Sequence, residues 1–429
     1  MSATLTRGNT SILPQELIDN IVDHASDDQE AQKHLSLVNR AWSQRTRHNL
    51  FQTVSFELGG RGCTRLSEVL RTNPLLYQHI QTMRIDHDRR DSLDSSFPSI
   101  LGVIDPKRLV NVHEISIYGD VESNLNWGTL PPGLRSALYD LLAKPHLTTL
   151  TLMDIRDIDV SFIGRNRRLK ELALCGVKHT PLSSPSISSD GPPATHLAAE
   201  KCSLRSLSVG QCADALQCLR AAATIVPQPV VLKVYSDGYD DKMDTALQIF
   251  SRNVEAYEII CVPTGDLTGT IGLPLHSGAL DFARLPKLKT LRIRLHHVQL
   301  WCLLSGPSMT ITTSLVQQIV RLRSTNCLED IDIVLDLDDL LHHWSLPTGG
   351  IDEMLHSVFN SASFVRAWTD LDNILGDNGA FSKLKKLRIW LEIPTHVARS
   401  KQELDSRVSV FKETVMPNLA RRGILEVIY

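Results

Sequence analysis

The chain has 429 residues, of which 42% are hydrophobic, and its formal net charge at pH 7 is −3. The near balance of 45 basic and 48 acidic residues argues against a nucleic-acid-binding protein, which would be strongly basic. No apolar run is long enough to span a membrane, and residues 1–13 lack the apolar core of a signal peptide. We therefore expect no nucleic-acid or membrane partner, and a cytoplasmic or nuclear location.

The eight cysteines are scattered and include no Cys-x-x-Cys pair. This spacing does not suggest a structural zinc site. In a reducing compartment such cysteines are expected to be small buried hydrophobic side chains rather than disulfide partners.

The N-terminal segment is expected to contain a disordered tail at 1–10 and a compact helical unit at 11–52. Pro14 suits the first position of a helix, and Glu16 in the first turn complements the helix dipole. An apolar stripe follows, formed by Leu17, Ile18, Ile21, Val22 and Ala25. The next helix is expected to carry Leu35, Val38 and Trp42 on one face, and a third short helix ends near Phe51.

This helical unit has more apolar residues than three short helices can conceal, and about forty residues rarely make a robust core alone. The surplus must be covered either by the rest of the chain or by another protein. Both interpretations, core packing and partner interface, remain open from the residues alone.

From Thr53 to the end, a short phrase recurs: apolar, two variable residues, apolar, one variable residue, apolar. Its eight copies begin at Ile80, Val112, Leu147, Leu169, Leu204, Leu288, Leu328 and Leu384. The final alternation predicts a strand with one buried face, and the leading apolar residue closes the turn into it. Such a unit cannot bury its apolar face alone, so its copies must stack.

Amphipathic helical stretches separate the strand phrases. They are Thr64–Thr72, Gly133–Ala143, Ala213–Ile225, Lys242–Asn253, Thr313–Ser324, Ile351–Ser361 and Leu404–Met416. Weaker strands are expected at Val230–Val234 and Glu258–Val262. The fold class is therefore α/β: residues 53–429 should form an irregular leucine-rich-repeat-like solenoid of parallel strands and helices.

Residues 181–193 contain five serines and four prolines, which predicts a flexible loop. The loop is either a tolerated insertion on the rim of the array or a phosphorylation site. A second local feature, the basic run Gly164–Lys170, is either a solvated face before a strand or one edge of a site for an acidic ligand.

The opening Leu-Pro-x-Glu-Leu-Ile of residues 13–18, followed by Leu-Ser-Leu-Val-Asn-Arg-Ala-Trp at 35–42 and Leu-Phe at 50–51, resembles an F-box. The chain is similar to fungal F-box proteins in which this motif precedes an irregular leucine-rich-repeat array. It departs from the family at Asn39, where cysteine is common, and at His24-Ala25, where the helix end is usually more apolar. The motif covers about 40 of the 429 residues.

The resemblance implies that the F-box docks on a Skp-type adaptor and, through it, on a cullin, while the repeats bind a protein substrate for ubiquitin conjugation. It places at the adaptor interface Leu13, Pro14, Leu17, Ile18, Ile21, Leu35, Val38 and Trp42. The substrate surface is expected on exposed strand residues: Thr149, Thr151, Lys170, Arg205, Arg292, Arg294, Asp330, Asp332 and Arg388. Their mixed charge favours a protein partner.

No catalytic constellation is found, and we expect no enzymatic activity, no metal and no cofactor. The most metal-like cluster, Asp336–Trp344, is explained as well by acidic residues at a helix start, because adjacent histidines on a helix point about 100° apart. Two alternatives to the ligase interpretation remain. One is a repeat scaffold whose first helices only cap the array; the other is a metal-dependent enzyme using His342 and His343.

Overall fold

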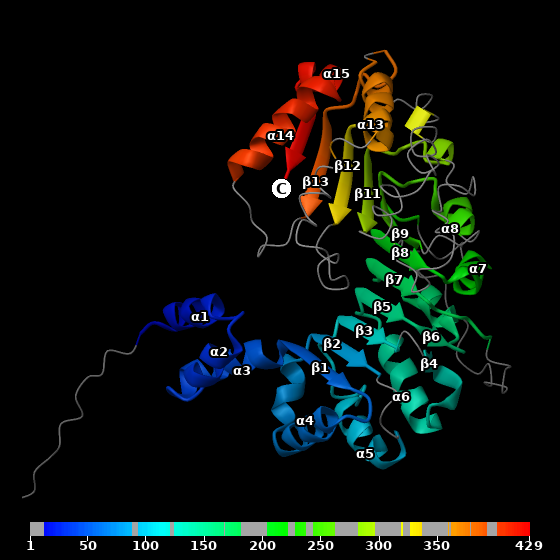
Figure 1. Ribbon diagram of the computed structural model, residues 1–429. Coiled ribbons are helices and arrows are strands. Elements are labelled where there is room, and N and C mark those ends of the chain that lie inside the picture. The colour runs from blue at the N-terminus through cyan, green and yellow to red at the C-terminus, as the bar shows by residue number, and fades with distance from the viewer. Residues whose placement is uncertain are drawn as a thin grey trace, which may run out of the picture. The chain divides into compact units, whose positions relative to one another are not determined.

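The computed structural model describes most of the chain in separate stretches (Figure 1). These are residues 13–87, 93–120, 124–166, 168–181, 204–221, 228–236, 243–261, 282–296, 319–320, 327–336, 359, 362–377, 379–392 and 401–429. The predicted tail at 1–10 and the Ser/Pro loop beyond residue 181 lie outside these stretches. The chain divides into two compact units, Met1–Thr151 and Leu152–Tyr429.

The first unit begins with three helices and continues as alternating helices and strands. In chain order it contains α1 (Gln15–His24), α2 (Gln29–Leu35), α3 (Arg40–Gln52), β1 (Thr53–Glu57), α4 (Arg61–Thr72), the 3-10 helix η1 (Pro74–His79), β2 (Thr82–Asp86), α5 (Leu93–Val103), β3 (Glu114–Tyr118), β4 (Leu125–Asn126), η2 (Trp127–Thr129) and α6 (Pro132–Leu142). Strands β1, β2 and β3 pair in parallel, with Val54, Met83 and Ile115 in register.

The second unit repeats the same alternation, and β5 (Thr149–Met153) contains the boundary between the units. It continues with β6 (Ile155–Arg156), η3 (Val160–Arg165), β7 (Glu171–Cys175), β8 (Ser206–Gly210), α7 (Ala213–Ala221), β9 (Val231–Ser236), α8 (Met243–Phe250), β10 (Ala256–Cys261), η5 (Phe282–Arg284), β11 (Thr290–His296), β12 (Asp330–Asp336), α13 (Ala362–Leu375), β13 (Lys386–Glu392), α14 (Lys401–Thr414), α15 (Pro417–Arg421) and β14 (Leu425–Ile428). Strands β7 to β14 are neighbours in chain order.

Each of the eight recurring phrases is a strand, as predicted, and its leading apolar residue is buried. These leading residues are between 0% and 4% exposed, as Leu288 and Leu204 illustrate. The two weaker strands are also confirmed, as β9 and β10. The recurring apolar pattern therefore marks the strands of a mixed α/β fold. The strands are parallel, and strands and helices follow one another as in leucine-rich repeats.

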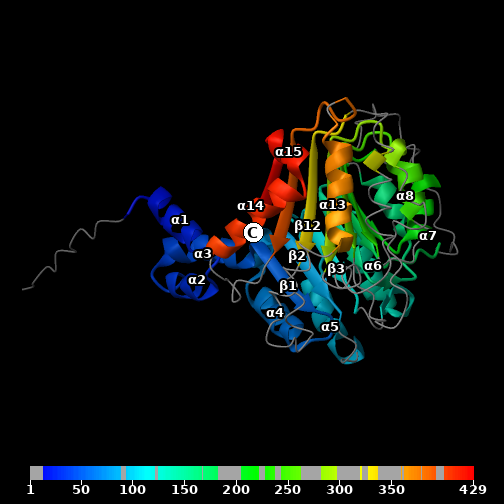
Figure 2. The same ribbon diagram turned by 45° about the horizontal axis from the view of Figure 1, so that its top comes forward.

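The core of the second unit lies between the sheet and its helices. On β11, Leu291, Ile293 and Leu295 are buried, while the alternate residues are half-buried on the other face of the strand. Aromatic rings join the layers: Tyr257 of β10 meets Phe282 with ring centroids 5.9 Å apart. The helices α8 and α13 follow the strands along one side (Figure 2). Period-two burial thus separates a helix-covered face from a polar face.

Several element predictions need correction. The second helix was expected to run through Leu35 and Trp42, but α2 ends at Leu35 and α3 begins at Arg40. Asn39 lies in the gap and caps α3, accepting hydrogen bonds from the Ala41 and Trp42 amides at 2.9 and 3.3 Å. Asparagine at this position favours a new helix start over continuation.

The short edge strand β14 and the helices α5 and α13 were not predicted. The expected helices at 313–324 and 351–361 lie almost entirely outside the described residues. Within the part of the chain that is described, no helix has the length and apolar character needed to cross a membrane.

Candidate functional site

The three N-terminal helices are held together by polar contacts around α1. Asp23 receives two hydrogen bonds from the Arg45 guanidinium on α3, with Nε–Oδ1 2.8 Å and Nη2–Oδ2 2.5 Å. The Asn49 side chain donates to the same carboxylate at 3.1 Å. The hydrogen bonds from Arg45 lower the pKa of Asp23, so the carboxylate stays ionised and ties α1 to α3 at neutral pH.

The apolar residues of α1 divide into an inward and an outward stripe. Ile18 and Val22 are 2% and 0% exposed and form the core of the helical unit. Leu13, Leu17 and Ile21 are 44–48% exposed. Leu17 and Ile21 are four residues apart, so they share one side of the helix, and Leu13 lies in the segment just before it.

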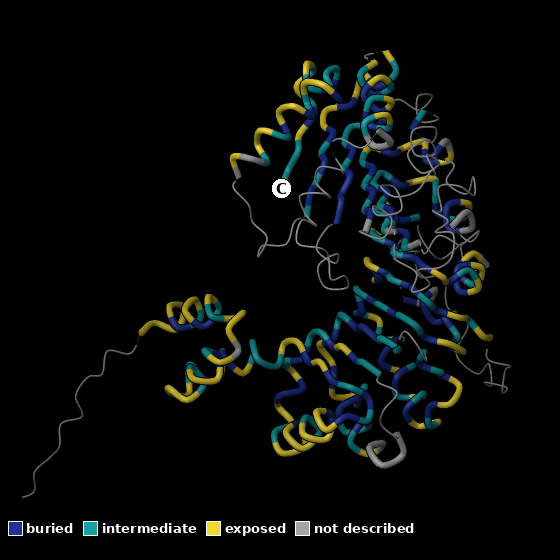
Figure 3. Tube along the Cα trace, in the orientation of Figure 1, coloured by how far each residue is buried: buried dark blue, intermediate teal, exposed yellow. Residues whose placement is uncertain are grey.

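The turn between α2 and α3 adds two further apolar side chains to the surface. Leu37 is 82% exposed and Val38 is 58% exposed. Together with Leu13, Leu17 and Ile21 they form the set that we call the N-terminal apolar residues. Figure 3 shows how much of α1 and of the α2–α3 turn is exposed. Contiguous exposed apolar patches are typical of interaction sites, so these residues are the candidate site of this unit.

The predicted adaptor-contact residues are therefore not all equivalent. Leu13, Pro14, Leu17, Ile21 and Val38 are exposed, whereas Leu35 and Trp42 are half-buried. Ile18 differs from these residues because it is buried, at 2% exposure, and belongs to the core of the helical unit. Leu37 was missed, although its place between a helix-ending Ser36 and the capping Asn39 marks a turn residue.

Helix α3 continues directly into the first strand and is fixed to the following 3-10 helix η1. Nδ1 of His48 lies 3.4 Å from Nδ1 of His79, and the two rings are edge to face. Burial lowers the pKa of His79, which favours its neutral form. At the end of α3, the Gln52 side chain donates to Gln81 at 3.2 Å.

The polar face of the second unit carries a row of alternating charges. Successive register partners from β9 to β14 are Lys233, Glu258, Arg292, Asp332, Arg388 and Glu426. We call this set the charged row. Opposite charges on neighbouring strands stabilise parallel pairing, as cross-strand pairs do generally.

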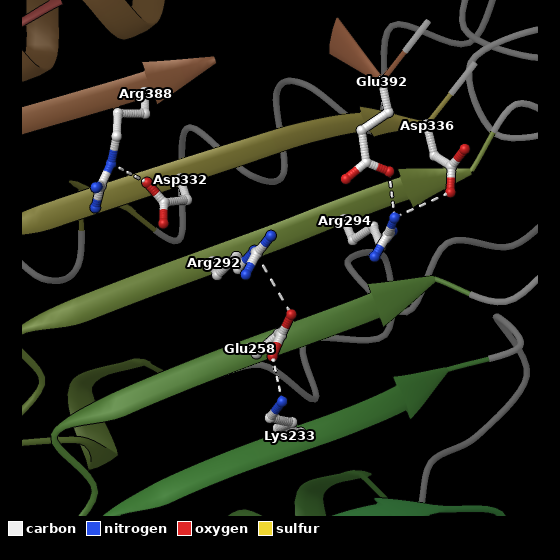
Figure 4. A network of polar contacts seen from close by, with 8 residues as sticks. All are labelled: Lys233, Glu258, Arg292, Arg294, Asp332, Asp336, Arg388 and Glu392. Carbon is white, nitrogen blue, oxygen red and sulfur yellow. Dashed lines mark hydrogen bonds and ion pairs between the residues drawn. The ribbon is translucent and has the colours of Figure 1, made fainter. Parts of the chain in front are cut away.

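Most members of the charged row are joined in pairs, as Figure 4 shows. Glu258 contacts both Lys233 and Arg292, at 3.2 and 3.6 Å. Arg388 donates to Asp332 at 2.6 Å. The cations of these pairs are 26–39% exposed and the carboxylates only 13–14%. The basic groups therefore lie outermost, above acids that already neutralise them.

A second cluster lies beside the charged row. Arg294 contacts Asp336 at 3.4 Å and also the carboxylate of Glu392. Each of the predicted substrate residues Arg292, Arg294, Asp332 and Arg388 thus has an oppositely charged partner on the sheet face, and Asp332 and Arg388 are partners of each other. Asp330 joins the same group through Arg388, at 3.9 Å.

The other predicted substrate residues lie elsewhere. Lys170 and Arg205 are exposed and lie just before β7 and β8. The Arg205 amide donates to the Lys170 carbonyl at 2.7 Å. Thr149 and Thr151 are half-buried on β5. Sequence reasoning missed Lys233, Glu258 and Glu426. Each directly follows a buried strand residue, as Arg292 follows Leu291. Aligning all strands on these buried residues would have identified them.

Metal ligands and cysteine thiols were the remaining candidates for chemistry. No three His, Cys, Asp or Glu side chains come together there in a way that could hold a metal ion. Of the predicted cluster Asp336–Trp344, only Asp336 is described. Burial raises the pKa of the Cys63 thiol to about 11 and that of Cys175 to about 12, so neither is a nucleophile at neutral pH.

Comparison with known proteins gives no family. No protein-family model matches the sequence, and no curated protein matches it. Among solved structures, an internalin from Listeria monocytogenes is 11% identical, with a TM-score of 0.26, covering 76% of this chain and 88% of its own. A Bacteroides fragilis protein is 12% identical, with a TM-score of 0.29, covering 80% and 67%. Scores this low carry no argument, so the fold assignment rests on the chain's own strands and helices.

Proposed function

We propose that the chain is the substrate-recognition subunit of a Skp–cullin–F-box ubiquitin ligase. The N-terminal apolar residues bind a Skp-type adaptor, and the repeats bind a protein substrate. The chain itself catalyses nothing; it brings a substrate to the ligase. The observation that carries the proposal is the outward stripe Leu13, Leu17 and Ile21, together with the exposed Leu37 and Val38.

The density of exposed apolar groups supports a partner rather than a simple cap. Of the eleven large apolar side chains that are exposed among the described residues, five lie between Leu13 and Val38. Complete burial of a fully exposed side chain of this kind is worth roughly 1.5–3 kcal/mol, and roughly half of that remains available for side chains that are 44–58% exposed. A partner that covers them recovers this free energy, which is the usual driving force of a helical interface.

The arrangement also fits the sequence motif that suggested an F-box. Asn39, where that family often has cysteine, serves here as the cap of α3 and holds the turn that exposes Leu37 and Val38. The half-buried Trp42 follows directly, and large aromatic side chains are common hot spots of binding. The departure at Asn39 is therefore compatible with an adaptor-binding surface.

The alternative is a repeat scaffold in which the three helices only cap the array. It is favoured by the attachment of α3 to the first repeat through the His48–His79 and Gln52–Gln81 contacts. A cap needs these contacts, but it does not need an exposed apolar stripe on α1. The two functions are distinguished by whether that stripe binds an adaptor.

The test is isothermal titration of the full chain with a purified Skp-type adaptor. Leu17→Asp should lower the affinity by about thirtyfold or more, the effect of losing a hot spot of about 2 kcal/mol. The matched control is Val410→Asp on α14, where the side chain is 55% exposed; it should bind like the wild type. The thermal midpoint of each variant is recorded in parallel. No binding by a folded wild type, or equal loss in both variants, would favour the scaffold.

A further inference from the structure

Strand β14 lies at the edge of the sheet in the second unit. In the described residues it pairs only with β13, with Leu425 opposite Leu387 and Glu426 opposite Arg388. In Figure 1 it is the red strand beside β13. Its side chains are accessible: Glu426 is exposed, and Val427 and Ile428 are half-buried.

The register determines which backbone groups of β14 point away from the sheet. The Leu387 amide donates to the Ile424 carbonyl at 2.8 Å. Because alternate residues of a strand direct their N–H and C=O groups to opposite sides, Leu425 and Val427 direct theirs outward. Among the described strands, β14 has no neighbour on its side away from β13, so these groups of Leu425 and Val427 have no strand to pair with there. An outward row of donors and acceptors can pair with a further strand.

Helix α14 packs on the helix-covered face of the sheet. Its Phe411 meets the rings of Trp368 on α13 and of Phe359, with centroids 6.0 and 5.3 Å apart. The apolar face of α14 is thereby used against the neighbouring helix. Val410 of the same helix is 55% exposed, so it lies outside this contact.

The charged row indicates what kind of strand would fit. From β9 the signs alternate as plus, minus, plus, minus, plus, minus, and the last member is Glu426. Arg388, its register neighbour, is bonded to Asp332. A cationic side chain on an added strand would continue the alternation next to Glu426. The flanking positions of that strand would lie beside Leu425, Val427 and Ile428 and would therefore be apolar.

We propose that the β14 edge binds an extended segment of a partner protein, with a lysine or arginine facing Glu426 and apolar, β-branched residues on either side. Backbone hydrogen bonds to Leu425 and Val427 provide the attachment, and Glu426 selects the charge, as in other cases of strand addition. This inference does not rest on the adaptor-binding role of the N-terminal helices. The two surfaces lie in different units of the chain.

The test uses the full chain and two short labelled peptides of alternating threonine and valine, one with lysine and one with glutamate at the centre. Binding is measured by fluorescence anisotropy. The wild type should prefer the lysine peptide by a factor of about two to five. Glu426→Lys should reverse the preference, whereas Glu413→Lys on α14, another exposed charge reversal, should leave it unchanged.

A second variant tests the backbone contribution. Val427→Pro removes an outward N–H that does not bond to β13, so the fold should survive, as proline does on edge strands, while peptide binding is lost. The thermal midpoint checks the fold. The proposal is overturned if neither peptide binds the folded wild type, if Glu426→Lys leaves the preference unchanged, or if Val427→Pro binds normally. It is also overturned if the wild type sediments as a dimer and Val427→Pro as a monomer, because a second copy of the chain would then occupy the edge.

Discussion

The charged row should contribute measurably to the stability of the second unit, and the Asp332–Arg388 pair is the place to measure it. The Nε–Oδ1 distance is 2.6 Å, and the side chains are 13% and 26% exposed. Two unit charges about 4 Å apart attract by about 4 kcal/mol at an effective dielectric constant near 20. Desolvation of both groups offsets most of this gain, which leaves an expected coupling of about 1–2 kcal/mol.

A double-mutant cycle isolates this coupling. Asp332→Asn retains the volume of the side chain and removes its charge, and Arg388→Met retains most of the apolar stem. Unfolding of the four proteins in urea is followed by tryptophan fluorescence, to which Trp390 on the same strand contributes. The coupling should fall when salt is added, because both groups are partly exposed. A coupling below about 0.3 kcal/mol would refute the stabilising role of the row, since distant, independent sites are additive within that limit.

Three further predictions concern the ends of the chain. Ile18→Ala should lower the free energy of unfolding of the N-terminal helices by about 2–4 kcal/mol, because it leaves a cavity. Leu17→Ala, at an exposed position, should change it by less than about 0.5 kcal/mol. Chemical denaturation of the two variants measures both values. Because the pKa of Asp23 is lowered in the folded state, its bond to Arg45 contributes above pH 3.8 and is lost as pH falls through the lowered value. An acid titration of Asp23→Asn should therefore lack this step, which amounts to less than about 1 kcal/mol for so exposed a pair. The Asp372 carboxylate accepts hydrogen bonds from the Asn418 and Leu419 amides at the start of α15, at 3.0 and 2.8 Å. Asp372→Ala removes this acceptor, so the rate of amide hydrogen exchange around α15 should increase by about tenfold or more, which corresponds to a loss of about 1.4 kcal/mol or more.

The repeat pattern made the strands predictable from sequence. Alternation after a leading apolar residue is a local signal, and burial of Leu288 and its counterparts depends only on the stacking of like units. Edge strand β14 lacked that signal because it has only four residues and because Arg422 stands where the other copies have the leading apolar residue. The break between α2 and α3 was missed because the apolar spacing from Leu35 to Trp42 imitates one helix, while the capping by Asn39 is a three-dimensional contact.

The candidate surfaces were only partly predictable. The apolar stripe of α1 was visible in the sequence, but which of two adjacent residues, Leu17 or Ile18, faces inward depends on the packing of the other helices. The charges of the sheet face were visible individually. Their mutual pairing, which turns an apparent set of free charges into a neutralised row, follows from strand register and could not be derived from composition.

The most direct test of the central claim is to determine which surface touches a Skp-type adaptor. A photoreactive phenylalanine analogue is placed at Leu17, and in a separate protein at Val410, both of which are exposed apolar positions. Each protein is irradiated with the purified adaptor, and the adducts are identified by mass spectrometry. The account predicts a covalent adduct from position 17 and none from position 410. Adducts from position 410 alone, or from neither position, would contradict it.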